Sequence, residues 1–176
     1  MIDLPLLTNS FLDYFVSDKL QDKTLVEIGA GDSTIFWGKY FNKVISYESD
    51  IQYFDYLKEK INKGNTELNL FDNNIFEDSK FLSNIKIADY IIVDNNPNYI
   101  DRYYFCKYAK ENKKESCPII LDNGTWNLRA YQYLQDYFFC MDFPGVNKAD
   151  ELTVTSIFNI EREPYYQYRI QNVGEA

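Results

Sequence analysis

Short apolar runs alternate along this sequence with longer segments in which apolar residues recur at helical spacing. Short runs bounded by turn residues are typical of buried strands. They predict seven strands, at residues 25–28, 44–47, 67–71, 89–94, 118–122, 138–143 and 152–160. The helical spacing predicts helices between them, at residues 3–20, 35–41, 51–62, 99–111 and 128–137, with a short helix or turn at 79–87.

Strands that alternate with helices indicate an α/β domain with a mainly parallel sheet. Only a short loop beginning at Pro144 separates the last two strands, so we expect an antiparallel pair at the sheet edge. The predicted fold is therefore Rossmann-like: a seven-stranded, mostly parallel sheet with an antiparallel last strand and helices on both faces. The 176 residues fit one domain, with a leading helix at 1–22 and a charged, tyrosine-rich tail at 162–176.

The turn after the first strand is the candidate cofactor site. Glu27, Gly29, Gly31 and Ser33 lie in the stretch EIGAGDS between this strand and the next helix. Glycines let backbone amides approach a ligand closely, and a helix N-terminus favours anions. Glu48 ends the second strand about 20 residues farther on, where such folds place an acid that accepts hydrogen bonds from ribose hydroxyls.

Two cofactors compete for this turn. A dinucleotide fingerprint, G-x-G-x-x-G, requires a third glycine, and Thr34 occupies that position. S-adenosylmethionine suits the early acid, because Glu27 favours the cationic amino-acid end of a sulfonium cofactor and would repel a pyrophosphate. The sequence therefore favours S-adenosylmethionine over a nicotinamide dinucleotide. A glycine turn that binds no cofactor is the remaining alternative.

Composition narrows the possible partners. The net charge is −9, so nucleic acid is a poor default partner. The absence of histidine excludes a histidine base and histidine metal ligands. The three cysteines lack metal-site spacing and fit reduced thiols.

No apolar run approaches the roughly 18 residues of a membrane span, and the N-terminus lacks a signal-peptide pattern, so we expect a cytoplasmic protein.

The strand, glycine turn and acid together resemble class I S-adenosylmethionine-dependent methyltransferases over residues 25–158. Within them, the sequence is similar to a small bacterial group often encoded beside glycan or secondary-metabolite genes, through EIGAGDSTIFW, VISYESD, YIIVD, IILDNGTW and TVTSIF. This resemblance implies an adenine contact at Asp72 and a place for Asp94 beside the methyl-transfer centre. It also implies cofactor contacts at Glu27, Gly29, Gly31 and Glu48.

A second resemblance points to a metal. Metal-dependent O-methyltransferases of the catechol type carry an Asp after the fourth strand and Asp-Asn after the fifth, and Asp94, Asp122 and Asn123 stand at those places. Their oxygens would suit Mg²⁺, which lowers the pKa of an acceptor hydroxyl. That family has a lysine shortly after the first Asp, whereas this sequence has residues 95–97, Asn-Asn-Pro. We therefore assign no metal ligand and keep the Mg²⁺ enzyme as an alternative.

The resulting hypothesis is methyl transfer to an oxygen or nitrogen of a small-molecule or glycan-type acceptor. Asp94 is the first candidate for the base that takes a proton from the acceptor, and Asp122 and Tyr99 are further catalytic candidates. The alternative from another class is a binding module that keeps the fold without turnover. The sequence leaves a homo-oligomer open.

Overall fold

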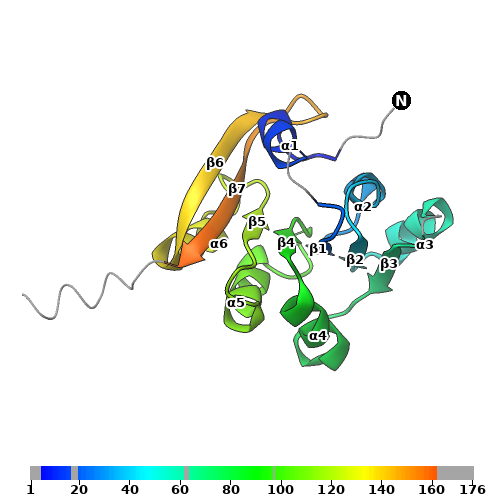
Figure 1. The fold of residues 1–176 in the computed structure, drawn as a ribbon. Coiled ribbons are helices and arrows are strands. Elements are labelled where there is room, and N and C mark those ends of the chain that lie inside the picture. The colour runs from blue at the N-terminus through cyan, green and yellow to red at the C-terminus, as the bar shows by residue number, and fades with distance from the viewer. Residues whose placement is uncertain (1–4, 17–19, 62–63, 97, 162–176) are drawn as a thin grey trace, which may run out of the picture.

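The structure, a computed structural model, describes residues 5–16, 20–61, 64–96 and 98–161. One seven-stranded sheet has the order β3-β2-β1-β4-β5-β7-β6 (Figure 1). The first five strands run parallel to one another, and β7 runs antiparallel to both β5 and β6. This confirms the predicted α/β fold with an antiparallel last strand. The strands are β1 (Thr24–Ile28), β2 (Lys43–Glu48), β3 (Thr66–Leu70), β4 (Tyr90–Val93), β5 (Ile119–Leu121), β6 (Phe138–Val146) and β7 (Leu152–Glu161).

Helices cover both faces of the sheet (Figure 1). The first face carries α1 (Asn9–Phe15) and α2 (Asp32–Trp37), and the opposite face carries α4 (Ser79–Ile87), α5 (Arg102–Asn112) and α6 (Leu128–Tyr137). The remaining helices are α3 (Ile51–Lys60), which packs against β2 and β3, and the short 3₁₀ helix η1 (Ile75–Glu77).

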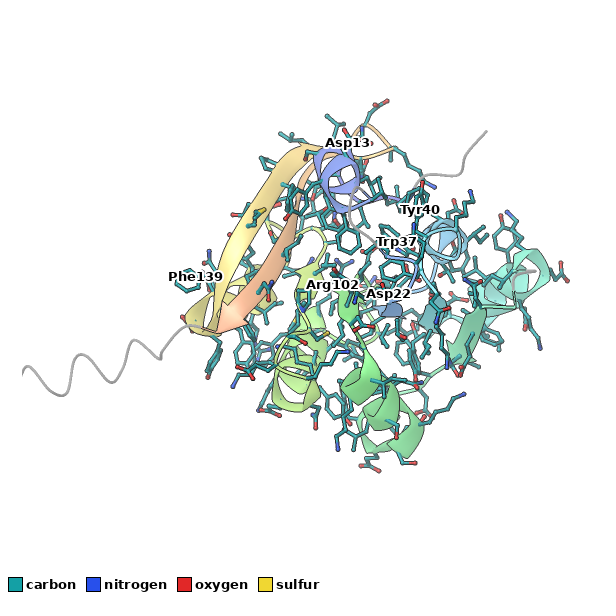
Figure 2. The ribbon with its side chains drawn as sticks, viewed as in Figure 1. Asp13, Asp22, Trp37, Tyr40, Arg102 and Phe139 are labelled. Carbon is teal, nitrogen blue, oxygen red and sulfur yellow. The ribbon has the colours of Figure 1, made fainter. Side chains whose placement is uncertain are left out.

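The sheet separates two apolar cores, and successive residues of a strand point into different ones. On β4, Ile91 and Val93 belong to the core under α4, α5 and α6, whereas Ile92 belongs to the core under α1 and α2. The central strand is therefore apolar throughout, as parallel strands buried on both faces are. Trp37 lies fully buried in the core under α1 and α2 (Figure 2).

Several element boundaries differ from the predicted ones. Within residues 5–16 the leading helix covers Asn9–Phe15, and parts of the predicted range, 1–22, lie outside the described residues. Thr8 precedes the helix because it is extended and bonds to the last two strands: its N–H donates to Thr155 and its hydroxyl to the Phe143 carbonyl. The sixth strand continues through Pro144 to Val146 instead of ending in a loop, since an edge strand tolerates a proline. The predicted tail at 162–176 lies outside the described residues.

Helix α5 begins three residues later than its hydrophobic pattern predicts. Residues 99–101 lie before the helix, and the Asp101 carboxylate accepts a hydrogen bond from the Tyr103 N–H and so caps the helix. The segment at 79–87 is a helix, and Asp78 caps it in the same way. Across the residues that the structure describes, no helix is long and apolar enough to span a membrane.

Candidate functional site

A cavity of about 530 Å³ opens at the carboxyl ends of the parallel strands. This is where open α/β sheets bind ligands. The loops after β1, β2, β4 and β5 form most of its wall, and the loop between β6 and β7 closes one side. The residues that carry its chemistry are Gly29, Gly31, Ser33, Glu48, Asp50, Asp94, Tyr99, Arg102, Asp122 and Trp126.

Gly29 lets two strand ends approach each other closely. Its φ is +97°, which L-residues with a side chain rarely adopt. A Cβ atom there would lie 2.5 Å from the Asn95 nitrogen and 2.5 Å from the Asp94 carbonyl carbon and oxygen. The backbone after β4 therefore fills the space beside Gly29. At Gly31 the nearest atom to such a Cβ is Ser33 Oγ at 3.6 Å, so the protein itself would tolerate a side chain.

Glu27 lies beneath the glycine turn and is fully buried. Its Oε2 accepts hydrogen bonds of 2.6 Å from both Thr34 Oγ1 and Ser46 Oγ, and Thr34 Oγ1 in turn accepts from the Gly31 N–H. Burial raises the pKa of Glu27 to about 7, against the opposing effect of these hydroxyl donors. Glu27 thus stabilises the conformation of the glycine turn through its hydrogen bond with Thr34, which in turn bonds to the Gly31 N–H. A direct contact from Glu27 to a cofactor stays a prediction.

Glu48 lines the cavity, and backbone hydrogen bonds fix the orientation of its carboxylate. Its Oε1 accepts hydrogen bonds from the N–H groups of Ser49 at 2.7 Å and Asp50 at 2.8 Å. Burial raises the pKa of Glu48, and these backbone donors oppose that rise. Within the described part of the chain, no hydrogen bond uses its Oε2. One oxygen is therefore fixed while the other is available to a ligand.

Arg102 lines the cavity and joins the loops after β4 and β5. Its side chain is 7% exposed and forms a 2.9 Å ion pair with Asp94 Oδ1. The same guanidinium donates to the Asn95 carbonyl at 2.8 Å, to the Asp122 carbonyl at 2.6 Å and to Asn123 Oδ1 at 3.5 Å. The fork geometry of arginine allows these bonds to form together. Arg102 thus fixes two neighbouring strand ends and supplies a positive charge to Asp94.

Asp122 is a buried carboxylate on the cavity wall, with 1% of its surface exposed. Its Oδ1 accepts a 2.6 Å hydrogen bond from Thr155 Oγ1 on β7. Its Oδ2 has no partner among the described residues. Burial, together with the negative charge of nearby Asp94, raises the pKa of Asp122 to about 7. Asp122 therefore changes charge near neutral pH.

Two of the three side chains considered for Mg²⁺ have an oxygen bonded to Arg102. Arg102 contacts Asp94 Oδ1 and Asn123 Oδ1, and it bonds to Asp122 through the backbone carbonyl and not through the carboxylate. No group of three or more His, Cys, Asp or Glu side chains within the described ranges could hold a metal ion. The donor set is one that binds an arginine.

Asp72 does not join the other predicted site residues. It lines a different hollow, beside Phe71 and Ile75, and its Oδ1 accepts a hydrogen bond from the Asn74 N–H. An adenine contact from Asp72 stays a prediction.

Tyr99 does lie on the main cavity, where its hydroxyl donates to Asp50 Oδ2 at 3.3 Å. The negative charge of Asp50 raises the pKa of Tyr99, which favours a role as a hydrogen-bond donor over one as a base.

Arg102 is not evident as a site residue from the sequence, because it stands inside a helical pattern and outside the strand-end motifs. One local signal was present: a cation in the first turn of a helix opposes the helix dipole, so such an arginine needs another reason to be there. The sequence also gives no sign that the loop between β6 and β7 lines the cavity. Its Lys148 pairs with Asp32 at 2.7 Å and so ties that loop to the glycine turn.

No protein-family model matches the sequence, and no curated protein does. Solved structures do resemble the fold. A presumed methyltransferase from Streptococcus mutans, in complex with SAH, has a TM-score of 0.59 at 16% identity, with 84% of this chain and 94% of that chain covered. An rRNA methylase from Streptococcus thermophilus has a TM-score of 0.58 at 15% identity, with 91% and 99% covered. A tRNA methyltransferase from B. subtilis has a TM-score of 0.58 at 16% identity, with 89% and 68% covered. At such identities the likeness establishes the fold.

Proposed function

We propose that this protein is an S-adenosylmethionine-dependent methyltransferase that acts on a small-molecule or glycan-type acceptor. The observation that carries the proposal is that one cavity brings three features together. They are a turn whose backbone requires glycine at Gly29, a Glu48 carboxylate with one available oxygen, and two carboxylates after β4 and β5. The methyltransferase structures of the same fold support it. When bound, the cofactor supplies a methyl group on a sulfonium.

The acidic wall of the cavity favours S-adenosylmethionine over a dinucleotide. Asp32, Glu48 and Asp50 lie beside the glycine turn or the strand next to it, and Glu27 lies beneath the turn. These groups would repel a pyrophosphate and attract the net positive charge of S-adenosylmethionine. We assign Glu48 to the ribose hydroxyls, and Gly29, Gly31 and Ser33 to the amino-acid end of the cofactor.

Calorimetric titration tests the cofactor assignment. We expect S-adenosylmethionine and S-adenosylhomocysteine to bind with micromolar dissociation constants and NAD to bind at least 100-fold more weakly (about 2.7 kcal/mol). If neither sulfur compound binds, the proposed function is wrong and the glycine turn is only architectural. If both bind but no acceptor is ever turned over, a non-catalytic binding module becomes the better description.

Replacing Glu48 with alanine should weaken cofactor binding by about 1.5–3 kcal/mol, the range for hydrogen bonds to a charged group. The same calorimetric titration measures the change. Glu59→Ala is the matched control, because Glu59 is exposed on the neighbouring helix α3 and does not line the cavity. An unchanged affinity in Glu48→Ala would remove the ribose assignment.

Asp122 is our candidate for the base that accepts the acceptor's proton. Arg102 supplies Asp94 with a counter-charge, whereas Asp122 has a pKa of about 7 and an unpaired oxygen. A base must be ionised to accept a proton, so kcat/KM should rise with pH up to about 7 and level off above it. Asp122→Asn should remove this rise and lower turnover about 100-fold.

Thr155 provides an independent check on this pH dependence. Its hydroxyl donates to Asp122 and lowers the carboxyl pKa. Thr155→Val should therefore move the midpoint of the pH profile upward while retaining activity at high pH. A profile that keeps its midpoint in Thr155→Val and persists in Asp122→Asn would return the role of base to Asp94.

Turnover should not depend on divalent cations, because Arg102 already bonds to Asp94 Oδ1, to Asn123 Oδ1 and to the backbone carbonyl of Asp122. We expect the rate to stay within about twofold after dialysis against EDTA and after addition of millimolar Mg²⁺. A rate that collapses on chelation and returns with Mg²⁺ would favour the metal-dependent alternative.

A further inference from the structure

We infer that the acceptor is an amine on a molecule without phosphate groups, and that Asp122 binds its nitrogen and receives its proton. The inference rests on the proposed function and specifies the acceptor that the same cavity would take. Three observations support it: the charge balance of the cavity wall, the unpaired oxygen of Asp122, and the exposed aromatic rings at the cavity.

Among the described residues, the cavity wall has no unpaired cation for an anionic acceptor. Six acidic and two basic residues of the described ranges line it. Both basic side chains already pair with carboxylates of the wall, Arg102 with Asp94 and Lys148 with Asp32. Phosphate recognition relies mainly on arginine, lysine or clustered backbone donors. In the glycine turn, the N–H groups of residues 29–31 already donate hydrogen bonds within the protein. The wall therefore disfavours phosphorylated molecules and RNA and favours a molecule that brings positive charge.

Asp122 points to a ligand that donates a hydrogen bond. A buried polar atom without a partner costs free energy, and a buried carboxylate costs more than a neutral group. Asp122 Oδ2 is such an atom, while Thr155 holds Oδ1 in place. A hydroxyl would supply one donor and no charge. An ammonium group would supply both a donor and the compensating charge, which Arg102 gives to Asp94 instead.

Aromatic side chains at the cavity suit a cationic or amino-bearing ligand. Trp126 is 60% exposed and Tyr99 is 50% exposed, and both line the same cavity as Asp122. Faces of exposed aromatic rings attract cations through their quadrupole. Large exposed rings beside a carboxylate are therefore consistent with an amine whose apolar part stacks on them.

The chemical step balances without any further reagent. The acceptor enters as an ammonium and gives one N–H proton to ionised Asp122, which frees the nitrogen lone pair. That lone pair forms the bond to the methyl carbon while the carbon–sulfur bond breaks and its electron pair goes to sulfur. The products are a methylated ammonium, S-adenosylhomocysteine and protonated Asp122, which returns its proton to water.

Matched pairs of acceptors test the inference. S-adenosylhomocysteine release is measured with phenethylamine against 2-phenylethanol, glucosamine against glucose, glucosamine 6-phosphate, and bulk tRNA. We expect amines to react at least tenfold faster than their hydroxyl partners, and glucosamine faster than its phosphate. Faster turnover of a hydroxyl compound, of the phosphate or of tRNA would overturn the inference. So would the absence of amine turnover in a protein that binds S-adenosylmethionine, a result that leaves the cofactor proposal intact.

A binding measurement removes the dependence on turnover. Calorimetry of the two amines against the S-adenosylhomocysteine complex should give dissociation constants that rise at least tenfold in Asp122→Asn. Asp136→Asn, an exposed carboxylate on α6 outside the cavity, should bind amines as the wild type does. Equal amine affinity in wild type and Asp122→Asn would overturn the assignment of Asp122. If the complex itself does not form, the proposed function fails and this inference fails with it.

Discussion

Replacing Gly29 with alanine should destabilise the protein by about 4 kcal/mol or more, which is at the upper end for single substitutions. Two effects combine: the positive φ strains any L side chain, and the new Cβ would lie 2.5 Å from backbone atoms of Asp94 and Asn95. Because those neighbours are backbone, the end of β4 must move and disturb the buried Arg102 network with it. Urea unfolding followed by circular dichroism measures the loss, and failure to fold agrees with the prediction.

Gly31→Ala is the matched control, since it changes the same residue type two positions along the same turn. Its Cβ would meet Ser33 Oγ at 3.6 Å and the Tyr53 hydroxyl at 3.7 Å, which are ordinary contacts, and its backbone is extended. We expect a change in the free energy of unfolding below about 1 kcal/mol. Cofactor affinity should still fall, because the methyl group projects where a ligand would approach the backbone. A Gly29→Ala protein as stable as Gly31→Ala would contradict the close approach of the two strand ends.

The sequence predicts the fold well because its signals are local and repeated. Apolar runs and helical spacing establish the strands and helices, and the order of strand, glycine turn, helix, strand and acid places Gly29 and Glu48 at one sheet edge. The predicted element boundaries are wrong where tertiary contacts determine the local structure. Thr8 leaves the helical pattern because it bonds to β6 and β7, and Pro144 stays in a strand because that strand lies at the edge.

The site is predicted only in part for the same reason. Asp94 and Asp122 are identified by their position after apolar strands, but a sequence does not reveal which carboxylate has a partner. The partner is Arg102, which pairs with the Asp94 carboxylate and bonds to the Asp122 backbone. Arg102 lies eight residues after Asp94 and twenty residues before Asp122, so no local pattern links the three. The different environments of the two acids arise from tertiary contacts. They suggest that Asp94 is the paired carboxylate and that Asp122 is the proton acceptor.

Arg102→Met should destabilise the protein by about 3–5 kcal/mol, the range for removing one partner of a buried ion pair. The substitution leaves the Asp94 carboxylate without its counter-charge and the carbonyls of Asn95 and Asp122 without their donors. Urea unfolding at neutral pH measures the loss. Arg129→Met is the control, because Arg129 is exposed on α6 and its ion pair with Asp101, at 3.6 Å, is a surface one. We expect that change to cost less than about 1 kcal/mol.

Two further variants separate charge from geometry at Arg102. Arg102→Lys keeps the positive charge but cannot bond to both strand ends at once, so it should recover only part of the lost stability. Arg102→Met combined with Asp94→Asn removes the uncompensated carboxylate and should be more stable than Arg102→Met alone, by a coupling free energy of about 1–3 kcal/mol. A double variant no more stable than Arg102→Met would mean that the arginine acts through the backbone carbonyls. The ion pair with Asp94 would then contribute little to folding, and the counter-charge argument that separates Asp94 from Asp122 would lose its basis.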